Sequence, residues 1–164
     1  MNLKSLGEIV LYTITAGTIA CSLPPPITIN ASDKIELGMS AVAYYDLKAL
    51  TDISPNDYLN STALLDVRKT VSSNGVPIRL EGALDIPKIN TRIYFETMPK
   101  ENGGGWEPDS IVVYGGCSSP MEPSQADYGS GCTDKSEYIG SSIDHQKRVG
   151  IENIATRGNS LFEK

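Results

Sequence analysis

The sequence is poor in the residue types on which most catalytic and nucleic-acid-binding sites depend. It holds a single histidine, His145, inside the polar stretch 144–148, so a Ser–His–Asp or Cys–His arrangement would have to recruit that one imidazole. Fourteen basic residues against twenty acidic ones give a net charge of −6, which argues against nucleic-acid binding. We therefore expect a protein that is not an enzyme, has no catalytic residues and has no nucleic-acid partner.

Metal, cofactor and membrane-spanning segments also lack support in the sequence. The three cysteines, Cys21, Cys117 and Cys132, form no Cys-x-x-Cys pair, and one histidine cannot complete a zinc site of the usual spacing. The glycine run 103–105 is not followed by the Lys and Ser or Thr of a phosphate-binding loop. No apolar run approaches the roughly 18 residues that cross a bilayer. We expect no metal, no cofactor and no membrane span.

What the sequence does contain is a succession of short alternating runs. Asn74-Gly75 separates the alternating apolar residues of 65–71 from those of 76–84, which predicts a β-hairpin because both turn residues tolerate positive φ. Pro77 should place its strand at an edge or lie at a position without a ladder bond. A second hairpin is predicted from 91–97 and 110–114. The 164 residues therefore indicate one mainly β domain, an antiparallel sandwich or barrel-like fold.

The region between the first strands and these hairpins is less clear. Residues 27–29 and 34–37 alternate around a turn-like segment, 30–33, and are predicted as two strands. The apolar run 39–50 begins like a strand but also allows a helix. Ser54-Pro55 is a typical helix start and predicts the single short helix of the domain.

Tyrosine supplies eight of the eleven aromatic residues, and tyrosine suits half-exposed surfaces. On a strand, Tyr44 and Tyr45 would point to opposite faces, so one of them could meet a partner. We take Tyr44, Tyr45 and Trp106 as candidate interface residues, with an ordinary place in the sheet core and rim as the alternative.

Two interpretations of residues 1–23 stay open. The β-branched runs 8–15 and 18–23 on either side of Ala16-Gly17 are typical of an N-terminal hairpin. The same segment resembles a lipoprotein signal, with Cys21 as the lipid acceptor and Pro24–Pro26 as a stiff spacer. Residues 1–114 thus form the predicted β domain, and residues 1–23 of it are either the hairpin or the lipoprotein signal.

Residues 115–164 are rich in Gly, Ser and Pro at first and then polar, which predicts a loop followed by an extended C-terminal arm. Cys117 and Cys132 bracket this loop. A disulfide there would stabilise the fold by roughly 3 kcal/mol and indicate an oxidising compartment or an extracellular particle. Two free thiols are the alternative.

Two roles follow from these patterns. The first is a structural subunit of a large assembly, a bacteriophage virion protein that decorates the capsid or serves at the head–tail junction or tail, with other protein subunits as its homo- or hetero-oligomeric partners. The second is an exported bacterial lipoprotein, anchored to the envelope through Cys21, that acts as a tethered binding or scaffold module of an envelope machine. The first would lie in the virion and the second on a membrane.

Overall fold

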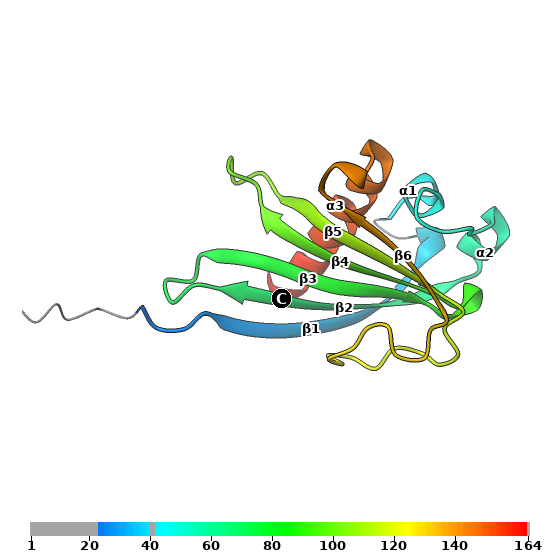
Figure 1. Ribbon diagram of the computed structural model, residues 1–164, viewed down its shortest axis with the longest axis horizontal. Coiled ribbons are helices and arrows are strands. Elements are labelled where there is room, and N and C mark those ends of the chain that lie inside the picture. The colour runs from blue at the N-terminus through cyan, green and yellow to red at the C-terminus, as the bar shows by residue number, and fades with distance from the viewer. Residues whose placement is uncertain (1–22, 40–41, 164) are drawn as a thin grey trace, which may run out of the picture.

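Six antiparallel strands follow one another in sequence order across a single sheet, β1-β2-β3-β4-β5-β6 (Figure 1). The computed structural model describes residues 23–39 and 42–163. Its strands are β1 (Ile27–Glu36), β2 (Thr62–Val71), β3 (Pro77–Ile86), β4 (Thr91–Pro99), β5 (Trp106–Gly115) and β6 (Asp134–Ile139). Its α-helices are α1 (Tyr44–Lys48), α2 (Pro55–Leu59) and α3 (His145–Asn159), and short 3-10 turns cover Leu37–Met39, Pro87–Ile89, Gly140–Ser142 and Ser160–Glu163.

The turn between β2 and β3 follows the Asn-Gly prediction. Gly75 has a φ of 76°, and its N–H donates to the carbonyl of Ser72, whose own N–H donates to the carbonyl of Val76. The edge placement predicted for Pro77 is wrong, because β3 lies between β2 and β4. Pro77 is instead the first residue of its strand, where the register with β2 shifts. A proline is tolerated at such a position because a ladder bond is already interrupted there.

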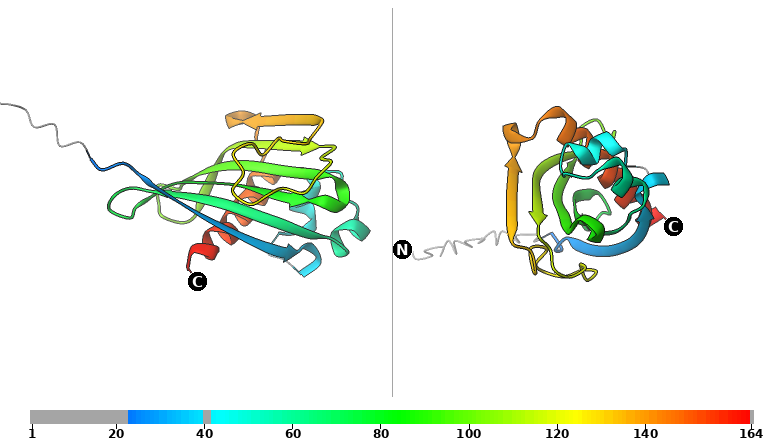
Figure 2. Two further views of the ribbon diagram at one scale, coloured as in Figure 1. Left: turned by 90° about the horizontal axis from the view of Figure 1, so that it is seen from below. Right: turned by 90° about the vertical axis from the view of Figure 1, so that its right-hand side faces the viewer.

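The inner face of the sheet curves around α3, which fills its hollow (Figure 2). The alternating inward residues of the central strands are fully buried against the apolar residues of the helix: Leu65, Val67, Leu80, Leu84, Ile93, Phe95 and Ile111 from the sheet, with Ile151, Ile154 and Ala155 from α3. The edge strands β1 and β6 do not pair with each other, so the sheet stays open.

Gly158 allows α3 to approach this sheet closely. A Cβ atom on Gly158 would lie 2.7 Å from Cγ1 of Val67 on β2. A Cβ atom on Gly82 of β3 would meet the sheet itself, 2.5 Å from the carbonyl oxygen of Asp66 and 2.7 Å from Cγ1 of Val67. Side chains essentially never approach so near, so the contact between the helix and the sheet depends on the missing methyl group of Gly158.

The fold is mainly β, as the sequence predicts, but a sandwich or closed barrel is wrong. The predicted C-terminal arm is also wrong, because residues 134–139 form β6 and residues 145–163 are helical. The few apolar residues of this region, Ile151 and Ile154 with small neighbours, gather on one narrow face of α3. Helix α3 therefore takes the place of the second sheet that a sandwich would pack against the first.

The predicted strand at Tyr44-Tyr45 is also wrong. These residues begin α1, where Tyr44 is half-buried with its ring 5.6 Å from that of Tyr58, while Tyr45 is exposed. The helix start at Ser54-Pro55 is confirmed, since the Ser54 hydroxyl accepts a bond from the N–H of Asp57. The domain thus has three α-helices rather than one among its described residues.

Strand β1 is continuous through the segment 30–33, so the turn predicted there is wrong. The N-terminal hairpin and the lipoprotein signal with its lipid acceptor Cys21 are both predicted for residues 1–23. Of these residues, the structure describes only Leu23, so both predictions lie outside the described part of the chain. No helix among residues 23–39 and 42–163 is long and apolar enough to span a membrane.

Candidate functional site

The molecule has two ends of different character (Figure 1). At one, which we call the hairpin end, β1 begins beside the tight turn 72–76, and the tight turn 100–105 lies at the same end of the sheet. At the other, which we call the cleft end, lie α1, α2, the turn Pro87–Ile89 and the long connection between β5 and β6. This connection, residues 116–133, is named the outer loop here because it covers the face of the sheet opposite α3.

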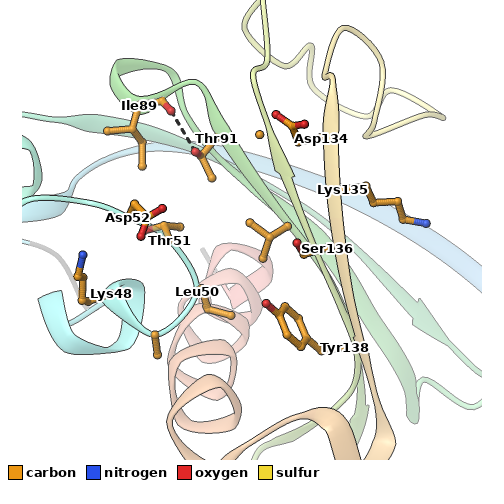
Figure 3. A pocket seen from close by; sticks show the side chains of 13 residues that line it. Lys48, Leu50, Thr51, Asp52, Ile89, Thr91, Asp134, Lys135, Ser136 and Tyr138 are labelled. Atoms are coloured by element: carbon orange, nitrogen blue, oxygen red, sulfur yellow. Dashed lines mark hydrogen bonds between the residues drawn. The ribbon is translucent and has the colours of Figure 1, made fainter.

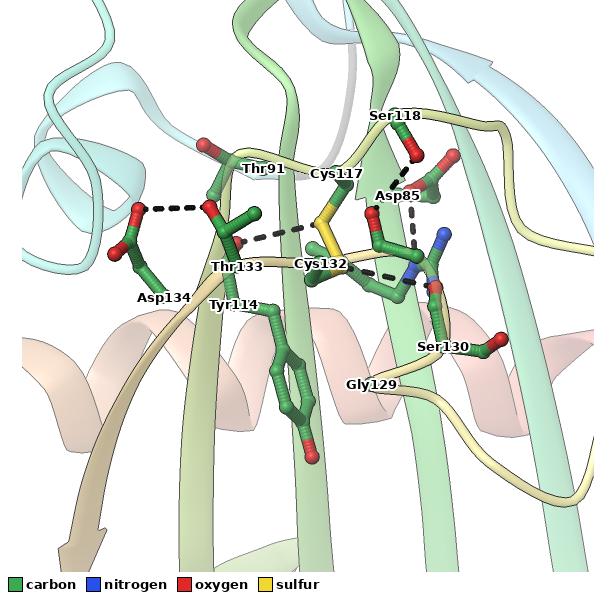
Figure 4. Close-up of a disulfide and its surroundings, with 12 residues drawn as sticks. Asp85, Thr91, Tyr114, Cys117, Ser118, Gly129, Ser130, Cys132, Thr133 and Asp134 are labelled. Atoms are coloured by element: carbon green, nitrogen blue, oxygen red, sulfur yellow. Dashed lines mark hydrogen bonds and ion pairs between the residues drawn. A yellow bond between two sulfur atoms is a disulfide. The ribbon is translucent and has the colours of Figure 1, made fainter.

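The ends of the outer loop are bonded to each other. Cys117 and Cys132, the pair that the sequence singles out, form a disulfide (Figure 4). The N–H of Cys117 donates to the carbonyl of Asn90 at 3.0 Å, and the N–H of Thr133 donates to the carbonyl of Gly115 at 3.0 Å. The bridge therefore fixes where β5 ends and where β6 begins.

A buried ion pair holds the middle of the outer loop against the sheet. Asp85 and Arg92 face each other across β3 and β4, both fully buried, with Arg92 Nε 3.0 Å from Asp85 Oδ1. The guanidinium also donates to the carbonyl of Tyr128 at 2.6 Å and to that of Ser119 at 3.2 Å. The remaining oxygen, Asp85 Oδ2, accepts the N–H of Met121 at 3.1 Å. Both charges are thus satisfied, as burial requires.

Strand β2 anchors the tip of the same loop. Asp66 is buried and accepts the N–H of Ser124 at 2.6 Å. The guanidinium of Arg68 lies over the ring of Tyr128, 4.9 Å from its centroid. The ring of Tyr94 stacks on that of Tyr128 with 4.9 Å between their centroids. Burial raises the pKa of Tyr128 to about 12. Polar contacts and the buried side chains of Met121 and Tyr128 thus hold the outer loop against the sheet.

Beside this loop, a polar cleft of about 510 Å³ opens between the segment after α1 and the inner side of β5 and β6 (Figure 3). Residues from four parts of the chain line it: Lys48, Ala49, Leu50, Thr51, Asp52, Ile89, Thr91, Val113, Gly115, Asp134, Lys135, Ser136 and Tyr138. The disulfide shapes one wall, because Asp134 and Gly115 lie beside the bridged residues.

The wall that follows α1 is held by its own apolar and polar anchors. Leu47 and Ile53 are fully buried on either side of it. Between them, the hydroxyl of Thr51 donates to the carbonyl of Leu47 at 3.0 Å and accepts the N–H of Ile53 at 3.3 Å. The segment therefore presents Lys48 and Asp52 from a fixed backbone.

The cleft offers charged and hydroxyl groups that the protein itself does not use. The side chains of Lys48, Asp52 and Ser136 have no ion-pair or hydrogen-bond partner among residues 23–39 and 42–163, and the hydroxyl of Tyr138 points into the cleft (Figure 3). Lys135 points away and pairs with Glu137 at 3.1 Å. Such a set of groups suits the binding of a small polar ligand.

The candidate interface residues are not gathered at one place. Tyr44 and Tyr45 lie in α1 at the cleft end, whereas Trp106 is buried at the hairpin end, at the start of β5. His145 is exposed at the first turn of α3. Within the described part of the chain, no group of three or more His, Cys, Asp or Glu residues is arranged to hold a metal ion.

Sequence reasoning missed both the cleft and the buried ion pair. The only signal for the pair was a charged residue next to apolar ones in each of two predicted strands, Asp85 and Arg92. No known protein-family model, curated protein or solved structure matches this chain.

Proposed function

We propose that this protein is an exported binding module, tethered through Cys21, whose polar cleft holds a small hydrophilic ligand. The observation that carries the proposal is the Cys117–Cys132 bond at the cleft end. Structural disulfides persist in oxidising compartments such as the periplasm and are rare in the cytosol. The bond therefore supports the interpretation of residues 1–23 as a lipoprotein signal over that of an N-terminal hairpin.

The arrangement of the tether agrees with this role. Pro24–Pro26 are exposed and separate Cys21 from the first residue of β1, as a stiff spacer between a lipid anchor and a folded domain would. The cleft lies at the other end of the strand, with its wall fixed by the disulfide. A preformed polar site on a tethered domain is what a ligand-binding or scaffold component of an envelope machine requires.

The virion-subunit hypothesis stays a prediction. One of its supports was the predicted polar C-terminal arm, which would need a partner subunit to become ordered. Residues 145–163 are instead helical and pack against the protein's own sheet, so the arm no longer argues for an assembly. A disulfide would also be compatible with an extracellular particle.

The anchor is tested by the intact mass of the protein from its native source, measured without reductant. We expect a chain that begins at Cys21, carries a diacylglycerol group and has one disulfide. Replacing Cys21 by alanine should then move the protein out of the membrane fraction. An unmodified chain that begins at Met1 or Asn2 would overturn the proposal and favour a virion subunit.

The cleft is tested separately by NMR titration of the ¹⁵N-labelled full chain with free amino acids and dipeptides. These probes carry a cation for Asp52 and a carboxylate for Lys48. We expect shifts at Ser136 and Tyr138 that disappear in Asp52→Asn but persist in the matched control Asp109→Asn, an exposed aspartate on β5. Shifts that are equal in both variants would remove the cleft from the proposal.

A further inference from the structure

We infer that the hairpin end of the protein lies against the phospholipid surface and that the cleft end is directed away from it. This inference rests on the proposed tether at Cys21. It adds a second, non-covalent contact with the membrane, made by named side chains of the folded domain.

Chain length limits the distance between the anchor and the hairpin end. Ile27, the first residue of β1, is six residues after Cys21 and lies at the hairpin end, opposite Val71 of β2. Six residues extend at most about 20 Å. The start of β1 and the neighbouring turn 72–76 are therefore held close to the lipid surface, and the turn 100–105 lies at the same end of the sheet.

The hairpin end carries exposed apolar side chains that the fold does not use. Val76 at the β2–β3 turn is 60% exposed, Ile27 is 57% exposed, and Met98 near the end of β4 is 52% exposed. Exposed apolar groups that cluster on a protein surface mark sites of contact with a partner or a membrane. A membrane held within reach by the tether is the partner that this position favours.

Val76 borders a groove that is less polar than the cleft. The groove has a volume of about 670 Å³ and lies between the two hairpins and the C-terminal end of α3. Pro77 and Pro99 form its rim together with Val76, and Trp106 lies within it. The exposed apolar side chains at this end, rather than the polar residues of the turns 72–76 and 100–105, would be the groups that enter the interfacial layer of the bilayer.

The charges around the groove show whether electrostatic attraction or apolar burial would hold this end of the protein on the membrane. Lys100 is paired with Glu152 at 2.9 Å, Lys69 faces the ring of Phe162 at 5.6 Å, and Glu101 and Glu163 lie nearby. This balance gives no basic patch for anionic lipids, and the whole chain has a net charge of −6. We therefore expect the contact to depend on apolar burial and on the tether, with little effect of salt or of anionic lipid.

The opposite end is carried away from the membrane by the length of the sheet. Strand β1 has ten residues and leads from the hairpin end to the cleft end, a distance of about 33 Å at the usual rise of a strand. The polar cleft and the disulfide would thus face the aqueous compartment, open to a dissolved ligand.

The single tryptophan of the chain provides the reporter for this test. Trp106 lies in the groove, so lipids brominated on their acyl chains should quench its fluorescence only when the hairpin end contacts the bilayer. The acylated full-length protein is reconstituted into phosphatidylcholine vesicles with or without brominated chains. The double variant Val76→Asp/Met98→Asp is compared with the matched control Met39→Asp/Leu59→Asp, whose residues are 87% and 67% exposed at the cleft end.

We expect bromine to reduce Trp106 emission at least about twofold in the wild type and in the control, and the hairpin-end variant to lose most of this quenching while it stays acylated. Circular dichroism checks that both variants are folded. An acylated protein whose Trp106 is not quenched, or is quenched equally in the two variants, would overturn the inference and leave the tether intact. Absence of the acyl group would overturn the proposed function instead.

Discussion

Replacing Arg92 by methionine should remove the central anchor of the outer loop. Methionine keeps much of the length and volume of arginine but carries no charge, so Asp85 would remain as a fully buried carboxylate without its partner. Breaking a buried pair on one side costs about 3–5 kcal/mol. The carbonyls of Ser119 and Tyr128 would also lose a charged donor. We expect the free energy of unfolding to fall by about 4 kcal/mol.

Urea denaturation of the wild type and the variant measures this loss, and Arg79→Met is the control. Arg79 projects from the same outer face but is partly exposed, where it pairs with Glu81 at 2.9 Å, so its loss should cost no more than about 1 kcal/mol. Adding Asp85→Asn to Arg92→Met should recover part of the stability, because the neutral amide carries no buried charge. If Arg92→Met and Arg79→Met cost the same, the buried pair does not hold the loop.

Three further perturbations test other parts of the structure. Serine at both Cys117 and Cys132 should lower the free energy of unfolding by about 3 kcal/mol, since the unfolded loop gains chain entropy, and reduced wild type should match this variant in urea. The free energy of unfolding should fall as the pH rises from 10 towards 12, because Tyr128 ionises near pH 10 in the unfolded chain but keeps its proton to about pH 12 in the folded one. Tyr128→Phe should lose less stability over the same pH range. An equal loss in the variant and the wild type would show that ionisation of Tyr128 is not the cause. Gly158→Ala should cost about 1–3 kcal/mol through its clash with Val67, so Val67→Ala should cost less in the Gly158→Ala chain than in the wild type; equal costs in the two chains would contradict the contact.

The central hairpins could be predicted because their determinants are local. Asn74-Gly75 adopts the turn that its residues favour, and the alternating residues on either side face the core and the outer surface in turn. Ser54 could be identified as a helix cap for the same reason, since its hydroxyl bonds to a backbone N–H only three residues away.

The parts that were not predictable depend on contacts between distant residues. Residues of α3 look like a polar arm in isolation, and only the curved inner face of the sheet gives their narrow apolar face a place to pack. Tyr44 and Tyr45 are typical of a strand, yet packing of Tyr44 against Tyr58 favours the helix. Arg92 is normally a surface residue, and nothing local shows that a loop will cover it.

The sequential order of the strands also bears on how the chain reaches its native state. Every strand pairs with its neighbour in sequence, so the sheet can form hairpin by hairpin with short loop closures, which favours rapid folding. The helix that covers the inner face, however, comes after all six strands in the sequence. A chain synthesised or translocated from its N-terminus would expose the apolar face of the sheet until α3 emerged, and this interval is when such a chain is most exposed to aggregation and most dependent on a chaperone.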